Sequence, residues 1–229
     1  NYLIAKMKFK PDFFLYENNK SAAQPIKDQI SRELGVPLMH INSALVSAQN
    51  RERFYAFNWK VDQPEDRGIV VRDILEDSTD EITYQFVHTT KLRSEQEGVI
   101  RLGDIGSTAQ AHRVYSRFGK SVTLNAGGGG QGGKTGLYLT REGIRKLTVR
   151  ECCRLRTLPG NYCRAVSHAQ AYKGLGNGWT AEVIIHILNG ALKDVPRDEE
   201  IVVLSMYDGI GTGRYCLDKM GFTNVKYFA

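Results

Sequence analysis

The chain has 229 residues, of which 41% are hydrophobic and 24% charged, a composition typical of a globular protein with one domain or slightly more. No apolar run approaches the roughly 18 residues of a membrane-spanning helix, so the sequence predicts no membrane span. The four cysteines show no CxxC spacing, which argues against a disulfide framework or any metal site and indicates a reducing, cytoplasmic compartment.

Positive charge is concentrated in the middle of the chain. The formal net charge is +6, yet residues 85–156 alone hold 13 Lys and Arg against 5 Asp and Glu. The remainder is therefore near neutral or slightly acidic. A basic middle between neutral flanks indicates an insert that binds a polyanion, and the alternative is an ordinary solvated surface.

The first third of the chain predicts short strands and a helix. Aromatic and apolar residues make residues 13–18 a strand that ends in a carboxylate. Ile26 and Ile30 lie four residues apart and predict a helix over residues 21–34. Residues 37–46 predict another strand followed by a turn.

The pattern weakens in the middle third. Residues 51–59 alternate charged and aromatic side chains ahead of a further strand, and residues 68–75 predict a strand or a short helix. Between residues 79 and 138 polar residues and glycine dominate, and hydrophobic periodicity is weak. The run AGGGGQGGKTG at 126–136 predicts a loop, either a flexible linker or glycine backbone that lies close to phosphates.

Helical periodicity returns after residue 147. Thr148 is a good N-cap for a helix over residues 147–159, because Glu151, three residues later, completes a capping box. Residues 176–188 predict a glycine turn that leads into a strongly apolar helix, and a polar linker follows at residues 193–200.

The C-terminal segment predicts the start of a Rossmann-like nucleotide site. Ile201–Leu204 is a continuous apolar run, as in a strand covered on both faces. Gly209, Gly211 and Gly213 let the backbone turn sharply and approach a ligand, and an amphipathic helix follows. A glycine turn alone is weak evidence for a nucleotide.

Two further sets of side chains are candidates for chemistry. Glu17 lies at the end of a predicted strand, where open α/β sheets place their active sites. Gln49, Arg51 and Arg53 are spaced two apart, so an extended backbone puts them on one face. Planar donors in a row suit a phosphate or a base edge, and the alternative is a solvated edge strand.

Six segments in this order resemble the DNA cytosine-5 methyltransferases, in particular phage and bacterial members of the kind found in restriction-modification systems. They are YEN at 16–18 for the family's ENV motif, SALVSAQNRER at 43–53 for QxRxR, KSVTLNA at 120–126 for the segment that closes the target-recognition region, RKLTVRECCRLRTLPGNY at 145–162 for RxLTxxExxRLQxxP, YKGLGNGW at 172–179 for the GN-containing last motif, and SMYDGIGTG at 205–213 for FxGxGG.

This chain departs from the family pattern in two ways. The FxGxGG motif comes last instead of first, and the catalytic Pro-Cys is missing, since none of the six prolines precedes a cysteine. The resemblance implies that the family's nucleophile lies in the interval between FxGxGG and ENV, and that none of the four cysteines here replaces it. We therefore expect a permuted, split or truncated chain whose central sheet lacks the strand between residues 201–204 and 13–15.

The resemblance implies an α/β fold, a Rossmann-like S-adenosylmethionine-dependent methyltransferase sheet, incomplete in this chain, with an inserted small target-recognition domain. Residues 1–80 and 171–229 would be catalytic, and residues 81–170 would recognise DNA. The implied reaction transfers a methyl group from S-adenosylmethionine to C5 of cytosine in duplex DNA, by base flipping and covalent catalysis. A missing segment or second subunit would supply Pro-Cys, in the cytoplasm of a bacterium or a phage-infected cell. The alternative is a non-catalytic, methyltransferase-like DNA-binding or partner subunit.

The same resemblance implies roles for individual residues. Glu17 would hold the flipped cytosine, and Arg51 and Arg53 would contact the base and the backbone near it. The cofactor would lie among Tyr207, Asp208, Gly209, Ile210, Gly211, Thr212 and Gly213 on one side and Asn177, Gly178 and Trp179 on the other. DNA would be contacted by Gln49, Arg113, Arg117, Lys120, Thr123 and Lys134.

Overall fold

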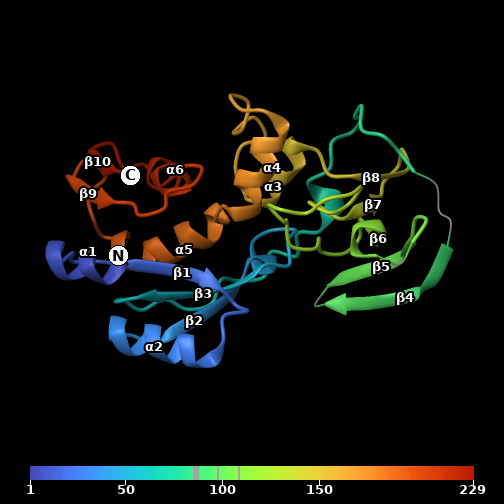
Figure 1. The fold of residues 1–229 in the computed structure, drawn as a ribbon. Coiled ribbons are helices and arrows are strands. Elements are labelled where there is room, and N and C mark those ends of the chain that lie inside the picture. Colours follow the sequence, from blue (N-terminus) through green and yellow to red (C-terminus); the bar gives the residue numbers. More distant parts are fainter. Residues whose placement is uncertain (85–87, 97, 108) are drawn as a thin grey trace.

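Three separate sheets organise the part of the chain that the computed structural model describes, namely residues 1–84, 88–96, 98–107 and 109–229 (Figure 1). The N-terminal sheet has the order β1-β3-β2 and is antiparallel throughout. Its members and the nearby helices are α1 (Tyr2–Phe9), β1 (Leu15–Asn19), α2 (Gln24–Leu34), β2 (Leu38–Asn42), the short 3-10 helix η1 (Ser43–Leu45) and β3 (Glu52–Phe57).

Local signals in the sequence determine α2. Pro25 occupies its first turn, where a missing N–H costs no hydrogen bond. Gly35 ends it with φ 73°, a left-handed conformation that glycine adopts without strain. The prediction of this helix is confirmed with a start three residues later. The expectation that residues 51–59 precede a strand was wrong, because they contain β3 itself. In residues 68–75 the short-helix alternative is the correct one, as the 3-10 helix η2 (Val71–Asp73).

A mixed five-stranded sheet occupies the segment whose sequence shows no clear periodicity. Its order is β4-β5-β6-β7-β8, and only β6 and β7 are parallel within it. The elements are β4 (His88–Gln96), β5 (Val99–Asp104), η3 (Gln110–His112), β6 (Arg113–Ser116), β7 (Leu137–Leu139) and β8 (Ile144–Lys146). Most of these strands are short, and register shifts interrupt two of the pairings, so an alternating pattern never develops.

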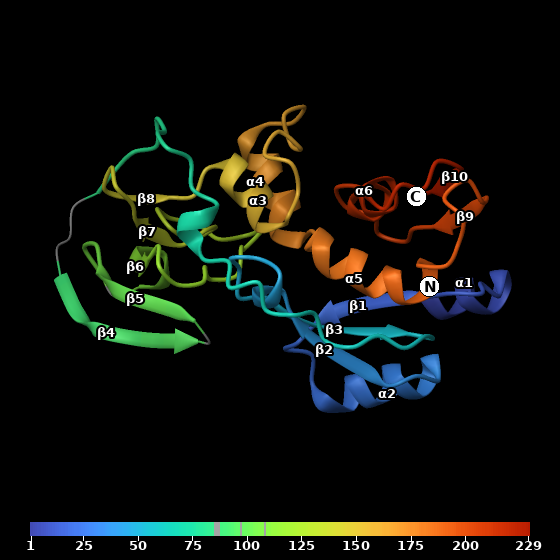
Figure 2. The ribbon, with the colours of Figure 1, turned by 180° about the vertical axis from the view of Figure 1, so that it is seen from behind.

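Three helices connect the two halves of the molecule (Figures 1 and 2). They are α3 (Val149–Leu155), α4 (His168–Asn177) and α5 (Ala181–Leu192). The predicted capping box of α3 is confirmed, since Thr148 and Glu151 each accept a backbone N–H of the other. The largest core cluster runs from β3 through α3 and α4 to α5, so this core joins both lobes.

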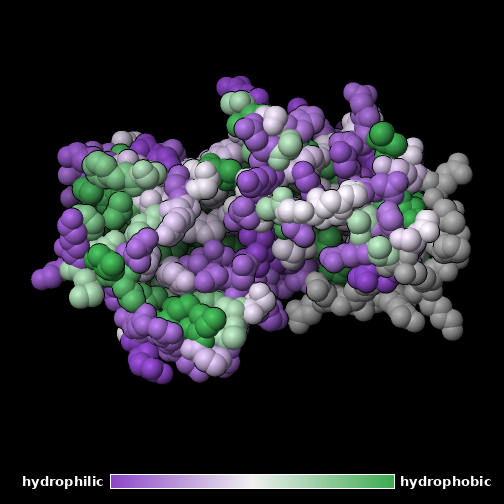
Figure 3. All heavy atoms as spheres, viewed as in Figure 1, coloured by the Kyte–Doolittle hydropathy of each residue, from purple (hydrophilic) through white to green (hydrophobic). Residues whose placement is uncertain are grey.

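The C-terminal unit is β9 (Ile201–Leu204), α6 (Thr212–Lys219) and β10 (Val225–Phe228), with β9 and β10 parallel. The expectation that β9 is covered on both faces was wrong, because Val202 is 64% and Leu204 50% exposed. Only Ile201 and Val203 pack inward, on the cluster that includes Leu217 and Phe222. Figure 3 shows apolar residues gathered at this end of the molecule, which also carries α1.

Both chain termini lie at this same end (Figure 1). In β1 Glu17 is the middle residue, opposite Tyr55, and not the last residue of a strand as expected. In the described ranges, no helix has the length and hydrophobicity that crossing a bilayer requires.

Candidate active site and DNA interface

Glu17 is held by a cation and an indole. The Nε atom of Arg53, on the neighbouring strand β3, lies 3.1 Å from one carboxylate oxygen. Trp179 Nε1, from the turn between α4 and α5, donates to the other oxygen at 3.2 Å. Glu17 and Arg53 are only partly buried, so the structure holds this carboxylate in place without closing it off from a ligand.

Arg51 has a different role from the one expected. Its side chain is only 4% exposed, and its two terminal nitrogens donate to the carbonyl oxygens of Gly176 and Gly178, each at 3.2 Å. Burial, and then the neighbouring Arg53, lower the pKa of Arg51 to about 10, which still leaves it charged at neutral pH. Arg51 therefore supports the α4–α5 turn, and the expectation that it touches the base is not met by this geometry.

Gln49 is fully buried, which corrects its assignment as a direct DNA contact. Its Oε1 accepts a hydrogen bond from Arg156 Nη1 at 2.7 Å. Its backbone forms an isolated parallel bridge with Ser121. Gln49 is thus part of the buried structure that supports the segment carrying Arg51 and Arg53.

The predicted cofactor turn has the left-handed backbone that its glycines suggest. The φ angles are 63° at Tyr207, 63° at Gly209 and 75° at Gly211. A Cβ atom on Gly209 or Gly211 would meet nothing closer than 3.6 Å, so the backbone is open to an approaching group there. Gly213 is different, since its Cβ would lie 2.5 Å from the Tyr227 hydroxyl, and it therefore serves packing and not ligand access.

Hydrogen bonds pin this turn in place. The hydroxyls of Ser205 and Tyr227 both donate to Asp208 Oδ1 at 2.5 Å, so that carboxylate oxygen has its partners within the protein. Tyr162 donates to the carbonyl of Ile210 at 2.8 Å. The hydroxyl of Thr212, in contrast, is buried and has no partner among the described residues. An unpaired buried hydroxyl beside an open glycine backbone fits a site that accepts a polar ligand.

The turn packs directly on the α4–α5 segment. A Cβ atom on Gly174 would lie 2.5 Å from the Ile210 side chain, and one on Gly178 would lie 3.1 Å from it. Trp179 also approaches Gly213, at 3.7 Å from the position of its Cβ. Segments that are distant in sequence are thereby brought together, and Trp179 links them to Glu17.

A cavity of about 330 Å³ opens between Arg53, Asn177 and the five-stranded lobe. Arg53 and Asn177 line one side of it. The opposite side is formed by residues of the lobe, namely Gln110, Tyr115, Val122, Thr123, Leu124, Asn125, Ala126, Gly132, Gly133 and Gly136. Figure 3 shows hydrophilic residues gathered between the lobes.

The glycine run at 126–136 is a packed loop, so the flexible-linker alternative was wrong. A Cβ atom on Gly128 would lie 1.8 Å from the carbonyl oxygen of Gly133, and one on Gly133 equally close to that of Gly129. Backbone hydrogen bonds from Asn125 to Lys134 and from Gly136 to Gly132 close the loop. Glycine is therefore required where two backbone segments touch.

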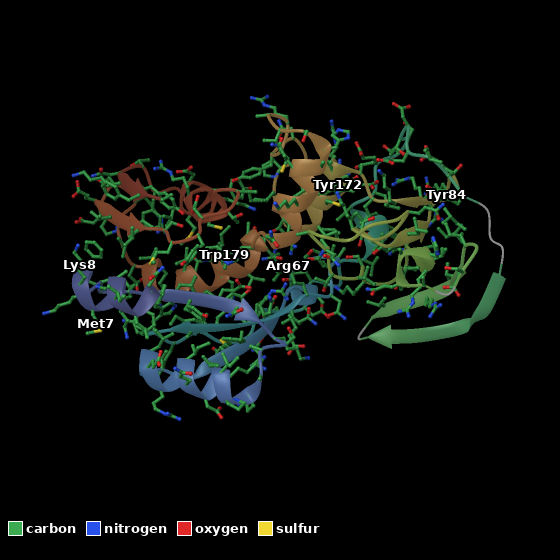
Figure 4. The ribbon with its side chains drawn as sticks, in the orientation of Figure 1. Met7, Lys8, Arg67, Tyr84, Tyr172 and Trp179 are labelled. Atoms are coloured by element: carbon green, nitrogen blue, oxygen red, sulfur yellow. The ribbon has the colours of Figure 1, made fainter. Side chains whose placement is uncertain are left out.

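The predicted DNA-binding side chains do not form one surface. Thr123 is exposed at the cavity, although its hydroxyl donates to the carbonyl of Asn50 at 2.6 Å. Lys134 lies over the ring of Tyr172 and lines a second cavity of about 290 Å³. Figure 4 shows Tyr172 on α4, toward the five-stranded lobe, and Trp179 near the start of α5. Arg113 begins β6 and Arg117 follows it, both half-buried.

Lys120 is a structural residue, which corrects its assignment to DNA. It is 9% exposed, and its ammonium donates to the carbonyls of Ala44 at 2.6 Å, Ile69 at 2.7 Å and Ser47 at 3.2 Å. Burial lowers its pKa. An ammonium with three carbonyl partners has no donor left for a phosphate.

Sequence reasoning missed two buried arginines, of which Arg156 contacts residues next to the site and Arg145 does not. Arg156 donates to Gln49 and to two carbonyls of α4, and Arg145 forms a doubly hydrogen-bonded pair with Glu151 at 2.8 and 2.9 Å. In the segment RLRTLP, Arg156 occupies the position where the resembled motif has Gln. This difference was the signal in the sequence that could have identified Arg156 as a residue to examine.

The four cysteines are buried and form no disulfide bond with one another. Burial raises the pKa of Cys153 and of Cys216 to about 12, and raises those of Cys152 and Cys163 as well. A thiol with a raised pKa is a poor nucleophile at neutral pH. This supports the expectation that none of them attacks a base.

The sequence model described as C-5 cytosine-specific DNA methylase matches residues 4–193, which is most of the chain. The chain belongs to this family. Its members are methyltransferases that generally use S-adenosylmethionine. The match ends before β9, so the relation of residues 205–213 to the FxGxGG motif stays a prediction.

Individual relatives agree with the family match. The type II methyltransferase M.HhaI of Haemophilus parahaemolyticus is 36% identical over 155 residues, 61% of this chain and 47% of the relative. M.Bsp6I of Bacillus sp. (strain RFL6), also a type II methyltransferase, is 28% identical over 189 residues, 79% of this chain and 59% of the relative. The chain thus spans about half the length of the curated relatives it matches.

Comparison with solved structures gives the same fold. The structure of the Entamoeba histolytica methyltransferase EhMeth superposes with a TM-score of 0.58 at 11% identity, over 81% of this chain and 64% of that one. The prediction of an α/β, Rossmann-like methyltransferase fold is therefore confirmed.

Proposed function

We propose that this chain is part of a DNA cytosine-5 methyltransferase, which transfers a methyl group from S-adenosylmethionine to C5 of cytosine in duplex DNA. The observation that carries the proposal is the position of Trp179. Its indole bonds to Glu17, while its own segment packs against the glycine turn of residues 205–213. The carboxylate proposed to face the base and the turn proposed to hold the cofactor therefore both contact one short segment, Gly174–Trp179.

Glu17 and Arg53 are the proposed base-contacting pair. A cytosine flipped out of the duplex presents N3 and an exocyclic amino group, and a carboxyl group in the position of Glu17 is suited to both. Arg53 lines the 330 Å³ cavity and also bonds to Glu17, so it orients the carboxylate and meets the sugar-phosphate of the flipped nucleotide. Donors placed in advance stabilise charge that develops on the base.

Cofactor binding is assigned to the two segments that pack on each other, residues 174–179 and residues 205–213. S-adenosylmethionine, when bound, supplies the methyl group as an electrophile. Gly209 and Gly211 let its polar end approach the backbone, and the buried Thr212 hydroxyl offers an unused hydrogen bond. Tyr207, which is 84% exposed, is the residue proposed to stack on the adenine ring. Asn177, Gly178 and Trp179 close the site opposite the turn.

A Pro-Cys segment is the proposed missing component, supplied in cis or by a second subunit. The family reaction needs a thiolate that attacks C6 of the cytosine, and the chain's own four thiols are buried with raised pKa values. The apolar surface at Val202, Leu204 and Met7, exposed by 64%, 50% and 75%, is suited to covering by such a segment. Methyl transfer by the combined protein is the direct test.

Residues 81–170 are the proposed target-recognition domain, and residues 1–80 and 171–229 the catalytic part. The five-stranded lobe carries most of the basic excess and faces the cavity across from Arg53. Arg113, Arg117, Thr123 and Lys134 remain the proposed DNA contacts, on the duplex rather than on the flipped base.

Replacing Arg117 with Ala is expected to lower the slope of log K against log salt by about 0.9, because one phosphate contact is lost. Replacing Lys120 with Met is expected to leave the slope unchanged and to lower the free energy of unfolding by about 1–3 kcal/mol, because three carbonyls lose their donor. Fluorescence anisotropy of a labelled duplex across a salt series measures the slope. Lys226→Ala, at an exposed site on β10, is the control. An unchanged slope for Arg117→Ala would assign that residue to ordinary surface.

Replacing Gly211 with Val is expected to abolish binding of S-adenosylhomocysteine, measured by calorimetry. A β-branched side chain is strained at φ 75° and fills the open side of the turn. Gly221→Val is the matched control, since Gly221 has φ 89°, open space around its Cβ and a position at the opposite end of α6. An equal loss of S-adenosylhomocysteine binding in both variants would show that backbone strain alone, and not contact with the ligand, explains the effect of Gly211→Val. A wild-type chain that binds duplex DNA and never the cofactor would instead support a non-catalytic DNA-binding subunit.

A further inference from the structure

Arg156 is a fully buried guanidinium that has no carboxylate partner among the described residues. It donates from Nε to the carbonyl of Leu175 at 2.6 Å, from Nη1 to Gln49 Oε1 at 2.7 Å and from Nη2 to the carbonyl of Gly176 at 3.2 Å. Burial, together with the nearby Arg51 and Arg53, lowers the pKa of Arg156 well below its usual value. A buried cation without a counter-charge is costly, so its contacts must offset that cost.

Those contacts complete the C-terminus of α4. The last carbonyls of a helix have no partner within the helix and need donors from elsewhere. Gly178 ends α4 in an extended conformation with φ −65°, so the usual left-handed glycine cap is absent, and its N–H satisfies only Gly174. Arg156 donates to the carbonyl of Leu175, and both Arg156 and Arg51 donate to the carbonyl of Gly176. Arg51 also donates to the carbonyl of Gly178. Cations at this end also complement the helix dipole.

The end of α4 that these arginines cap contains or directly precedes residues that line the cavity or contact Glu17. Asn177 lines the cavity together with Arg53, and Trp179 donates to Glu17. We propose that Arg156 is a positioning residue: with Arg51 it caps α4 and thereby sets Asn177 and Trp179 against Glu17 and the cofactor turn. Its effect on ligand binding rests on the function proposed above, whereas its effect on the position of Trp179 does not.

The chain allows a direct measurement of that position. It contains two tryptophans, so a Trp59→Phe background leaves Trp179 as the only indole. Arg156→Met removes all three hydrogen bonds at similar length, and Arg156→Gln, the residue of the resembled motif, keeps part of them. We expect Trp179 emission to shift to the red and acrylamide quenching to rise in the order Arg, Gln, Met. Affinity for S-adenosylhomocysteine should fall about tenfold or more in Arg156→Met.

Arg145→Met is the matched control for general destabilisation. Arg145 is also a fully buried arginine, and its partner is Glu151 in the first turn of α3, whereas Arg156 lies at the C-terminal end of that helix. All variants are measured at temperatures below their unfolding transitions, and Arg156→Gln replaces Arg156→Met if the latter does not fold. Unchanged Trp179 quenching in a folded Arg156 variant, or an equal change in Arg145→Met, would overturn the proposal. If Trp179 responds as expected but the wild type binds no S-adenosylhomocysteine, the positioning role stands and the proposed function fails.

Discussion

The 229-residue chain alone is expected to transfer no methyl groups to duplex DNA, and transfer is expected to appear when a Pro-Cys segment of the family is added in cis or in trans. In its proposed role Glu17 stabilises a reacting cytosine, but a carboxylate there does not form the covalent adduct with a thiolate that makes C5 nucleophilic. The measurement is incorporation of tritiated methyl groups from S-adenosylmethionine into duplex DNA of mixed sequence.

Two variants make this experiment specific. A Cys→Ser change in the added segment should abolish the restored activity, and Glu17→Gln in this chain should lower it at least about 100-fold, because the carboxylate no longer orients the base. Robust incorporation by the isolated chain would show that one of its own cysteines acts as nucleophile. Such activity would contradict both their burial and the raised pKa values of Cys153 and Cys216.

Replacing Arg145 with Met is expected to lower the free energy of unfolding by about 3–5 kcal/mol, because it leaves the Glu151 carboxylate buried without its cation. Both side chains are almost completely inaccessible, at 1% and 0%, and they share two short hydrogen bonds. Glu151 also accepts the N–H groups of Thr148 and Glu76, so the pair connects three segments. Urea unfolding followed by circular dichroism measures the change.

An exposed ion pair provides the comparison. Arg214 and Asp218 lie one turn apart on α6 with side chains 42% and 50% exposed, so Arg214→Met should cost less than about 1 kcal/mol. The double variant Arg145→Met, Glu151→Met should be more stable than Arg145→Met alone, because it removes the uncompensated charge. A loss below 1 kcal/mol in Arg145→Met would show that water reaches Glu151 after the substitution.

Local elements were predictable wherever the sequence contains residues that start or end a helix. Thr148 and Glu151 specify the start of α3, and Pro25 and Gly35 bracket α2, since caps act within one helical turn. The family assignment also followed from the sequence, because six short motifs occur in it together. The five-stranded lobe was not predictable in detail, since short strands with register shifts leave no period to detect.

Side-chain roles at the site were decided by burial, which no local pattern reveals. Gln49, Arg51 and Arg53 occur at a regular spacing, yet only Arg53 reaches the cavity, while Arg51 and Gln49 bond inward to the α4–α5 turn and to Arg156. Lys120 looked like a phosphate ligand and proved to be surrounded by carbonyls. A guanidinium or ammonium is the same donor toward DNA and toward a backbone carbonyl. The sequence by itself determined the family, the capped helices and the residue types of the site. Which acceptor each cation meets depends on distant segments, 51 to 76 residues away for Lys120 and up to 127 residues away for Arg51, and only the tertiary structure decides that.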